Sequence, residues 1–453
     1  MENRKTALIV GMARSGISSA KLLYKNGYRV LINDIKREIP GLIDALKGIE
    51  YVNYLGAPAE ALLDGVDLVV ISPVIPLTKP FVSMARARGI EVIGEIELGY
   101  RFSDRGSRFV CIGGTNGKTT TTTLTGEIFK AAGETTYVLG NIGIPITEHS
   151  MDIKAGDVVV AETAALQLES IDTFRPNAAG LLNITEDHLN RFNNSMEQYI
   201  AAKARMFENQ TEDDFAILNL DDPIVSGLAE KTKAKVLWIS QKQEVDEGVF
   251  NSDGILYWRH NKETQVIINA KELQIPGAHN IENAMCASAL ALCMGVSMGV
   301  IRQVLRSFMG VEHRIEFVRE KNGIRYINDS KATNPDSTIK AIEAMDRPTI
   351  LLLGVGEYDK YSDFVPLFNA FNGKVKAVVA SGVTVPEILA GAEITGFKEF
   401  YVSRGTFTEM VELATKLAKP GYNVLLSPAA ASWGMFADYE ERGRKFKEIV
   451  KKL

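Results

Sequence analysis

The stretch FVCIGGTNGKTT, residues 109–120, joins a run of apolar residues to a glycine-rich loop that ends in Gly117, Lys118 and Thr119. It predicts a buried strand, a tight turn and a helix that begins at Lys118. In such a loop the backbone N–H groups can approach phosphate oxygens, and the helix N-terminus adds partial positive charge. The lysine can neutralise the outer phosphates, and a threonine hydroxyl can ligate Mg²⁺. We therefore interpret the loop as a phosphate-binding site.

One position departs from the strict phosphate-loop pattern. GxxxxGK[ST] would place a glycine at position 112, where this chain has Ile112. A glycine-rich turn with a solvated lysine is therefore the alternative interpretation. The position of GKTT directly after a buried strand favours phosphate binding.

Strand-like and helix-like segments alternate on both sides of this loop, a pattern typical of α/β proteins with parallel sheets. A chain of 453 residues is too long for one hydrophobic core. The polar stretch 103–108 and the segment 308–312 have the character of boundaries. We predict three α/β domains, at residues 1–104, 105–309 and 310–453.

Composition excludes several classes of function. The formal net charge of −5 leaves none of the Lys/Arg excess that marks a nucleic-acid-binding surface. The three cysteines, Cys111, Cys286 and Cys293, are too few and too scattered for a disulfide framework or a CxxC metal site. No apolar run is long enough to span a bilayer, and the N-terminus lacks a signal-peptide pattern. We expect a cytoplasmic monomer that binds no nucleic acid and does not insert into membranes.

The first predicted strand leads into a second glycine turn, GMARSG at residues 11–16, and Asp34 closes the next strand. The turn imitates a dinucleotide-binding fingerprint, but Ala13 stands where a middle glycine would let a pyrophosphate approach the backbone. A nicotinamide-dependent dehydrogenase would use such a turn. A turn that only packs a helix on a strand would look the same, so both interpretations stay open.

Further polar residues end two strands of the central domain. Glu162 follows the apolar run 158–161, and NITEDH at residues 183–188 ends the following strand. Strand ends in an open α/β sheet face the same crevice as the phosphate loop, so Glu162 and His188 suit a Mg²⁺ site beside bound ATP. A lone histidine is more often a hydrogen-bonded structural residue. Lys203, on a predicted helix, would by itself be interpreted as a surface lysine.

Three polar clusters lie towards the C-terminus. In GAHNIEN, residues 277–283, Asn280 is either a helix N-cap or, together with Asn283, a side chain that recognises the edge of a purine. Arg314 lies at the second boundary, where a guanidinium could reach a phosphate. NDSKATNP, residues 328–335, ends a strand with more charged, hydroxyl and amide side chains than a simple turn needs.

Together these segments resemble the Mur ligases. The motifs that carry the resemblance occur in the order seen in that family and span nearly the whole chain: GTNGKTT, GNIGIP, NITEDHL, YIAAKARMF, GAHNIENA, EHRIEF, NDSKATNP, LLSPAAAS and YEERGRKF. The short N-terminal domain and the NDSKATNP and SPAAAS segments look like the members that add D-glutamate. The resemblance implies a Rossmann-like UDP-binding domain, a central phosphate-loop ATPase with a mostly parallel sheet, and a Rossmann-like domain that binds the amino acid.

The resemblance also implies an activity, cofactors and site residues. It implies an ATP- and Mg²⁺-dependent ligase that joins D-glutamate to UDP-N-acetylmuramoyl-L-alanine through an acyl phosphate, in peptidoglycan precursor synthesis. Lys118, His188 and Lys203 would be catalytic, and the metal ligands would be Thr119, Glu162, His188 and Lys203 as a carbamate. ATP would contact Gly114, Thr115, Asn116, Gly117, Lys118, Thr119, Thr120, Asn280, Asn283, Arg314 and Asp329. The other substrates would contact Ser15, Asp34, Lys36, Arg37, Asn141, Lys331, Thr333, Lys360, Ser432 and Tyr439.

Several segments depart from the family pattern. AALQLE at residues 164–169 lacks two hydroxyls of the usual SSFQLE, SPVIP carries Val74, LNR at 189–191 lacks a carboxylate, and Tyr361 follows Lys360. The phosphate loop and the main metal ligands are retained. A related ligase that adds a different amino acid, such as a folylpolyglutamate synthase-like enzyme, and a catalytically weakened, nucleotide-binding regulatory homologue therefore remain alternatives.

Overall fold

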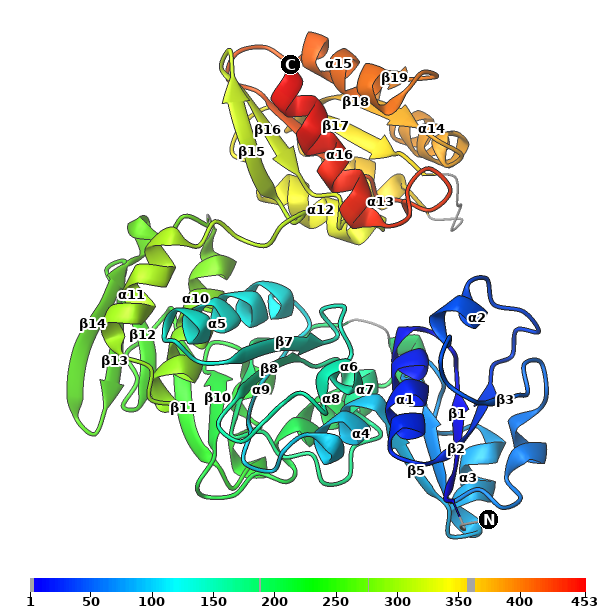
Figure 1. Ribbon diagram of the computed structural model, residues 1–453. Coiled ribbons are helices and arrows are strands. Elements are labelled where there is room, and N and C mark those ends of the chain that lie inside the picture. Colours follow the sequence, from blue (N-terminus) through cyan, green and yellow to red (C-terminus); the bar gives the residue numbers. More distant parts are fainter. Residues whose placement is uncertain (1–3, 187–188, 276, 357–362) are drawn as a thin grey trace. The chain divides into compact units, whose positions relative to one another are not determined.

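The computed structural model describes residues 4–186, 189–275, 277–356 and 363–453 (Figure 1). The chain forms two compact units, one of residues 1–273 with 278–308 and the other of residues 309–453 with 274–277. Three sheets are present in the described residues, two in the first unit and one in the second. The domain limits expected at 104/105 and 309/310 stay a prediction.

The first sheet has five parallel strands in the order β3-β2-β1-β4-β5. They are β1 (Thr6–Val10), β2 (Arg29–Asn33), β3 (Val52–Asn53), β4 (Leu68–Ile71) and β5 (Glu91–Gly94). The helices are α1 (Arg14–Lys25), α2 (Leu42–Ala45), α3 (Pro80–Ala87) and α4 (Glu95–Phe102), with a 3-10 turn at Ala59–Leu62. β1 is buried throughout because both faces of the sheet pack into apolar clusters. The strand order reverses between β1 and β4, which is where open α/β sheets bind ligands.

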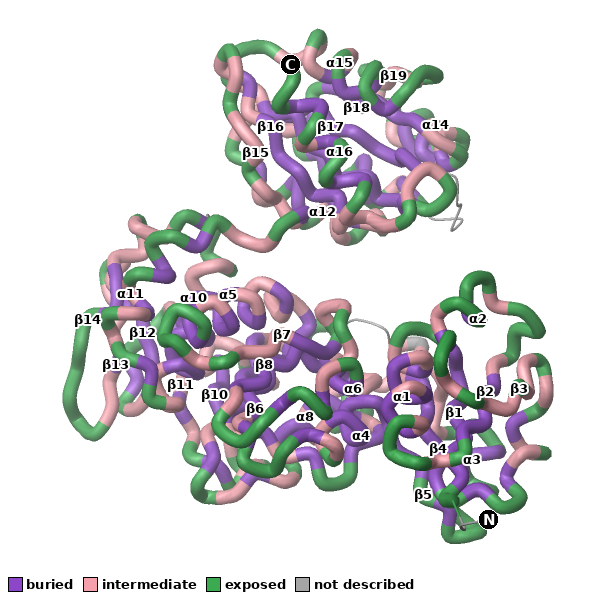
Figure 2. The backbone as a smooth tube through the Cα atoms, in the orientation of Figure 1, coloured by how far each residue is buried: buried purple, intermediate pink, exposed green. Residues whose placement is uncertain are grey.

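The central sheet has nine strands in the order β14-β13-β12-β11-β10-β9-β6-β8-β7. β12–β13 and β13–β14 pair antiparallel, and the other neighbours pair parallel. Its strands are β6 (Arg108–Gly113), β7 (Thr136–Gly140), β8 (Val158–Glu162), β9 (Ala178–Leu181), β10 (Phe215–Asn219), β11 (Lys235–Ser240), β12 (Gly248–Ser252), β13 (Ile255–His260) and β14 (Glu263–Asn269). Figure 2 shows the central strands as the buried layer of this domain.

The helices of the central domain lie between these strands and after them. They are α5 (Lys118–Ala131), α6 (Ile146–His149), α7 (Ala165–Leu168), α8 (Met196–Ala204), α9 (Pro223–Ser226), α10 (Ala278–Cys293) and α11 (Met298–Ser307). Short 3-10 turns occur at Leu189–Phe192, Arg205–Phe207, Ala229–Lys231 and Ala270–Glu272.

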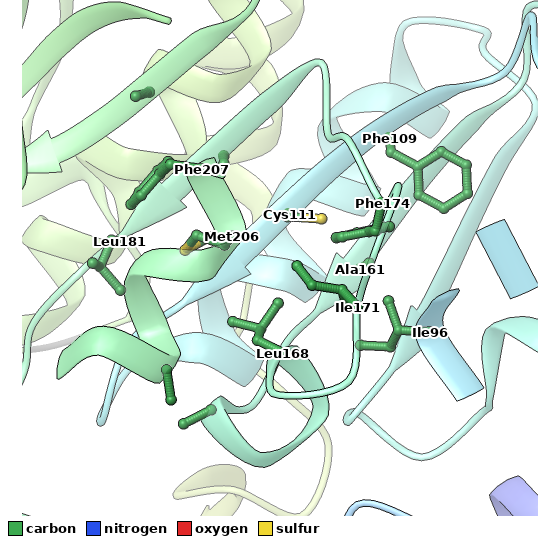
Figure 3. Close-up of a cluster of buried hydrophobic side chains, with 14 of the residues drawn as sticks. Ile96, Phe109, Cys111, Ala161, Leu168, Ile171, Phe174, Leu181, Met206 and Phe207 are labelled. Carbon is green, nitrogen blue, oxygen red and sulfur yellow. The ribbon is translucent and has the colours of Figure 1, made fainter. Parts of the chain in front are cut away.

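One apolar cluster fixes α8 against the central sheet (Figure 3). Phe109 and Cys111 of β6 belong to it, together with Met206 and Phe207, which follow α8 directly. A Cβ atom on Gly113 would lie 3.0 Å from the sulfur of Met206, so the segment after α8 packs closely against the strand that leads into the phosphate loop. This packing turns the inner face of α8 towards the loop.

The third sheet, in the second unit, has the order β15-β16-β20-β17-β18-β19. Only β15 and β16 pair antiparallel among these described strands. The strands are β15 (Glu316–Lys321), β16 (Ile324–Asn328), β17 (Thr349–Gly354), β18 (Val375–Ser381), β19 (Phe400–Val402) and β20 (Asn423–Leu426). The helices are α12 (Pro335–Glu343), α13 (Val365–Asn369), α14 (Val385–Thr395), α15 (Phe407–Leu417) and α16 (Tyr439–Lys452).

The predicted α/β class with three mostly parallel sheets is confirmed. The helix that begins directly after the phosphate loop, as the sequence predicts, is α5 (Lys118–Ala131). Among the residues that the structure describes, no helix combines the length and apolar character needed to cross a membrane.

Candidate functional site

The phosphate loop connects β6 to α5 at the carboxyl edge of the central sheet. Gly114 has φ 144° and Gly117 has φ 84°, conformations that residues with a side chain rarely adopt. α5 begins at Lys118, so the N–H groups of Lys118, Thr119 and Thr120 lie in its first turn, where no carbonyl of the same helix can accept them. Such N–H groups bind anions. This geometry suits the phosphate-binding role that the sequence suggests.

Two lysines contact the backbone of this loop. The Nζ of Lys118 donates to the carbonyl oxygens of Gly114 and Thr115, both at 2.9 Å. The Nζ of Lys203 donates to the carbonyl of Gly114 at 2.7 Å and lies 4.7 Å from the centre of the Tyr199 ring. Lys203 is only 3% exposed. Its interpretation as a surface lysine is wrong, because the packing of α8 turns it inward.

Glu162 ends β8 beside the loop, since β8 pairs with β6 through Ile112 and Glu162. Its Oε1 accepts a hydrogen bond from the Nδ2 of Asn141 at 2.8 Å. Its Oε2 is buried and accepts no hydrogen bond from the part of the chain that the structure describes. A buried carboxylate oxygen without a donor is costly, and a divalent cation would satisfy it. Thr119, which is buried in the first turn of α5, adds a hydroxyl on a helix that packs against β8, and oxygen donors of these kinds fit Mg²⁺.

Asn280 and Asn283 lie on α10, which packs against α5. α10 begins at Ala278, so Asn280 is inside the helix and is not its N-cap. The Nδ2 of Asn283 donates to the Oδ1 of Asn280 at 3.0 Å. The Oδ1 of Asn283 accepts a hydrogen bond from the hydroxyl of Thr121 at 3.1 Å. These contacts bring both asparagines to the phosphate loop. Adenine recognition by them stays a prediction.

The N-terminal turn follows β1. The carboxylate of Asp34 accepts the N–H of Met12 at 2.8 Å and the N–H of Lys36 at 3.1 Å, so both of its oxygens hold the backbone. Ser15 is half-buried in the first turn of α1, whereas Lys36 and Arg37 are exposed. Their contacts with UDP stay a prediction.

The loop that holds Asn141 is fixed to the N-terminal domain through α6. Thr147 donates from its hydroxyl to Ser18 of α1 at 2.8 Å, and its N–H donates to Glu95 of α4 at 2.8 Å. Glu95 is buried, and this burial raises the pKa of its carboxyl. The exposed Asn141 therefore lies on a loop whose far end is anchored to α1 and α4.

In the second unit, Asp329 follows β16 and is buried. Its carboxylate accepts hydrogen bonds from the hydroxyl of Ser427 at 2.7 Å and from the N–H of Ile315 at 3.2 Å. Burial raises its pKa to about 7, although these donors and the charge of Arg314 oppose the shift. Asp329 thus connects the segment of Arg314 to the turn after β20.

The other expected residues of this unit lie on neighbouring turns. The Nζ of Lys331 is 5.7 Å from the centre of the Tyr439 ring. Tyr439 begins α16, and its carbonyl accepts the hydroxyl of Ser330 at 2.8 Å. Ser432 is buried and Thr333 half-buried. The turns that carry these residues follow β16 and β20, which are adjacent in the sheet.

An acidic cluster in the same unit does not resemble a catalytic metal site. Glu312, His313 and Glu316 present possible ligand atoms within 4.8 Å of one another. Lys447 donates to Glu316 at 2.8 Å and also pairs with Glu312. Asn328 lies 2.9 Å from the Nδ1 of His313. These partners already neutralise the cluster, so we assign no metal to it.

Two predicted site residues, His188 and Lys360, lie outside the described residues. In the first unit, Lys118, Glu162, Lys203, Asn280 and Asn283 gather around the phosphate loop or the strand ends beside it. Arg314, Asp329, Lys331, Thr333, Ser432 and Tyr439 belong to the second unit.

The sequence did not single out several residues that organise the site: Ser18, Glu95, Thr121, Asn183, Tyr199, Ser427 and Arg442. The role of Asn183 could have been predicted from its position, because an asparagine just after a buried strand lies at the sheet edge where the phosphate loop begins. The role of Arg442, within YEERGRKF, could not have been predicted from the sequence, since an arginine on a charged helix is normally solvated.

Three family models match the chain. They describe a Mur ligase MurD-like N-terminal domain at residues 5–94, a Mur ligase middle domain at 112–291 and a Mur ligase glutamate ligase domain at 313–430. The matched segments contain both glycine turns and the NDSKATNP turn. The chain belongs to the Mur ligase family, whose members are ATP-dependent ligases.

Relatives that are similar along the whole chain belong to one member of the family, the D-glutamate ligase. The UDP-N-acetylmuramoylalanine–D-glutamate ligase of Clostridioides difficile is 44% identical over 99% of both chains. That of Alkaliphilus metalliredigens is 45% identical over 100% of this chain and 99% of its own. The crystal structure of UDP-N-acetylmuramate–alanine ligase from Thermotoga maritima aligns with a TM-score of 0.59 and 20% identity over 99% of each chain, a likeness of fold.

Proposed function

We propose that this chain is the ligase that joins D-glutamate to UDP-N-acetylmuramoyl-L-alanine, with ATP as the energy source, in peptidoglycan precursor synthesis. The observation that carries the proposal is its identity of 44–45% with D-glutamate-adding ligases along the whole chain. The phosphate loop and the buried carboxylate of Glu162 support it, because ATP-dependent chemistry needs both anion donors and metal ligands.

Mg²⁺ would be held by oxygen atoms of Thr119 and Glu162, by His188 and by Lys203 as a carbamate. When bound, it would neutralise phosphate charge and orient the reacting oxygens. The buried Oε2 of Glu162 supports this assignment because it has no donor among the described residues. The position of Lys203 against Gly114 supports a role beside the phosphates.

The proposed reaction has two steps. The alanyl carboxylate attacks the γ-phosphorus of ATP, ADP leaves, and an acyl phosphate forms. A free carboxylate is a poor electrophile because its leaving group would be oxide, whereas the acyl phosphate can release phosphate. The amine of D-glutamate then attacks the carbonyl carbon and loses a proton, and the tetrahedral intermediate expels phosphate to leave the amide.

The side chains of this chain would mainly position groups and neutralise charge. Lys118 and the N–H groups in the first turn of α5 would face the phosphates, with Arg314 as a further cation. Lys331 and Lys360 would bind the carboxylates of D-glutamate by charge-assisted hydrogen bonds, worth roughly 1.5–3 kcal/mol each. Asp329 would contact the ribose, and Thr333, Ser432 and Tyr439 would line the nucleotide or amino-acid site. Ser15, Asp34, Lys36 and Arg37 would bind UDP, and Asn141 the muramoyl group.

A phosphate-release assay with a panel of amino acids tests the proposal. D-Glutamate should support release in the presence of ATP, Mg²⁺ and UDP-N-acetylmuramoyl-L-alanine, and L-glutamate, L-alanine and meso-diaminopimelate should not. A clear preference for another amino acid would instead indicate a related ligase. Nucleotide binding without turnover of any amino acid would indicate a regulatory homologue.

The proposal includes a cytoplasmic, monomeric enzyme that binds neither nucleic acid nor membrane. Its co-substrate ATP and the reduced state of its three cysteines agree with that compartment. Analytical ultracentrifugation of the purified chain, with and without nucleotide, would measure the oligomeric state directly.

A further inference from the structure

Asn183, two residues after β9, makes a paired contact with the backbone N–H and carbonyl of one residue of the phosphate loop, Asn116. The N–H of Asn116 donates to the Oδ1 of Asn183 at 2.8 Å, and the Nδ2 of Asn183 donates to the carbonyl of Asn116 at 3.2 Å. The backbone carbonyl of Asn183 also accepts the N–H of Thr115 at 2.9 Å. The carboxamide thus binds the loop as a neighbouring strand would bind it.

These contacts divide the N–H groups of the loop into two sets. The N–H groups of Thr115 and Asn116 donate to Asn183. The N–H groups at the start of α5 belong to the other set, which can face phosphate. Asn116 is therefore an anchor point of the loop, and its N–H does not serve as a phosphate donor.

Without such an anchor the loop would be loosely defined. Gly114 and Gly117 have positive φ angles, and glycine loses more conformational freedom on ordering than any other residue. If the loop became ordered only when ATP bound, the free-energy cost of ordering it would weaken the affinity of the protein for ATP. Asn183 lowers this cost in the free protein because it fixes the backbone of Asn116, which lies between the two glycines.

Asn183 also extends the contact towards α10. Its Nδ2 lies 3.5 Å from the Oε1 of Glu282, which is next in sequence to Asn283. The Oδ1 of Asn283 would lie only 2.3 Å from a Cβ atom on Gly117, so α10 closes the other side of the loop. β9 and α10 therefore hold the loop from two directions.

We propose that Asn183 is a positioning residue for the ATP phosphates: its carboxamide pairs with the backbone N–H and carbonyl of Asn116 and keeps the loop in its phosphate-binding conformation before the nucleotide arrives. The inference rests on the proposed ATP-binding function of this loop. It assigns Asn183 no contact with ATP itself.

Titration calorimetry with Mg²⁺ and the nucleotides AMP, ADP and a non-hydrolysable ATP analogue would test this role on the full-length protein. We expect Asn183→Ala to weaken binding of ADP and the ATP analogue by at least tenfold and binding of AMP by less than threefold. The loss should depend on the phosphates because the base and ribose do not need the loop. Asn183→Asp keeps the acceptor for the N–H of Asn116 but places an oxygen opposite the carbonyl of Asn116 and the carboxylate of Glu282, so it should also weaken ADP and the ATP analogue more than AMP.

Asn219 offers a matched control. It is a buried asparagine at the end of the next strand, β10, and its Nδ2 donates to the carbonyl of Leu182 at 2.9 Å. Like Asn183 it also bonds to Glu282, but among the described residues its side chain makes no hydrogen bond to residues 114–117. Asn219→Ala should lower the melting temperature but leave affinity for the ATP analogue within threefold of wild type. Equal losses for AMP and the ATP analogue in Asn183→Ala, or the same affinity as in Asn219→Ala, would overturn the inference. Wild-type protein that binds the analogue but adds no D-glutamate would contradict the proposed function alone.

Discussion

Arg442 donates a hydrogen bond from Nη1 to the carbonyl of Val355 at 3.0 Å, and neither residue has any exposed surface. Val355 has φ 64°, an uncommon conformation for a β-branched residue, which persists only where the surroundings enforce it. The same guanidinium donates to the carbonyl of Ala430 at 3.1 Å and to the carbonyl of Ser330 at 2.9 Å. One side chain on α16 thus connects the turns after β17, β20 and β16.

Replacement of Arg442 by methionine should destabilise the second unit. The change leaves several buried carbonyl groups without donors, and each unsatisfied group costs about 1–3 kcal/mol. We expect a loss of roughly 3–5 kcal/mol, read as a lower urea midpoint for the transition of this unit. Arg319, which is half-buried and binds the carbonyls of Val450 and Lys451 near the C-terminus, provides a matched Arg319→Met control with a smaller loss. Equal losses in the two variants would show that the three turns do not depend on Arg442.

The carboxyl of Asp329 should make the stability of the second unit depend on pH. Burial raises its pKa to about 7 from an ordinary value near 3.8. A carboxyl with a raised folded-state pKa stabilises the fold fully below the unfolded pKa and loses that contribution as pH rises through the folded pKa. Wild-type protein should therefore lose stability between about pH 4 and pH 7 relative to Asp329→Asn, at about 1.4 kcal/mol for each pKa unit.

The check is the difference in melting temperature between wild type and Asp329→Asn, measured at several pH values in the same buffer system. Arg314 and Arg442 are the charged groups that oppose the shift. A difference that does not change between pH 4 and 7 would show that Asp329 titrates near its ordinary value.

The order of strands and helices could be predicted because hydrophobic runs and glycine turns are local signals. β6 and α5 lie on either side of the phosphate loop as FVCIGGTNGKTT predicts, and α5 begins at Lys118. The position of Glu162 beside the loop also followed from local information, since parallel strands end at one edge of a sheet.

The direction of long polar side chains could not be predicted in the same way. The sequence around Lys203 favours a surface lysine, yet the packing of Met206 and Phe207 turns the lysine to the backbone of Gly114. Arg442 likewise lies on a helix rich in charge. Its partners are carbonyl groups of three turns that are distant in sequence, and these turns come together only in the folded chain. Contacts of this kind depend on tertiary packing and leave no periodic trace in the sequence.

Lys118→Ala should abolish most ligation without unfolding the protein. In the hydrogen bonds described above its ammonium donates to the backbone carbonyls of Gly114 and Thr115, and the loss of such hydrogen bonds typically costs about 0.5–1.5 kcal/mol each. Its charge would act on the phosphoryl group as negative charge develops, and removal of such a group typically costs ~10²–10³ in rate. The measurement is the turnover number with circular dichroism as the check of folding. Near-normal turnover by a folded variant would refute the phosphate-loop assignment.

The N-terminal domain should bind the UDP-linked substrate and not NAD. Asp34 stands where a dinucleotide-binding domain has the carboxylate that binds the adenosine ribose of NAD, and both of its oxygens already accept backbone N–H groups. Titration calorimetry should detect UDP-N-acetylmuramoyl-L-alanine and no heat of binding with NAD. Asp34→Ala should weaken the first interaction by about tenfold or more, because it releases the turn. Tight binding of NAD would favour the dehydrogenase interpretation instead.

Lys203 should act as a carbamate that helps to hold Mg²⁺. Carbamylation joins the neutral amine to CO₂ and releases a proton, so the site must favour the neutral amine or trap the product. Burial at 3% exposure beside Gly114 excludes bulk water, whereas Ala164 and Ala165 lack the hydroxyls that would help to bind the product. Lys203→Ala should lose most activity and regain part of it with short carboxylic acids, and Lys118→Ala, measured in parallel, should regain none. Full activity of Lys203→Ala, or equal recovery by both variants, would rule out the carbamate.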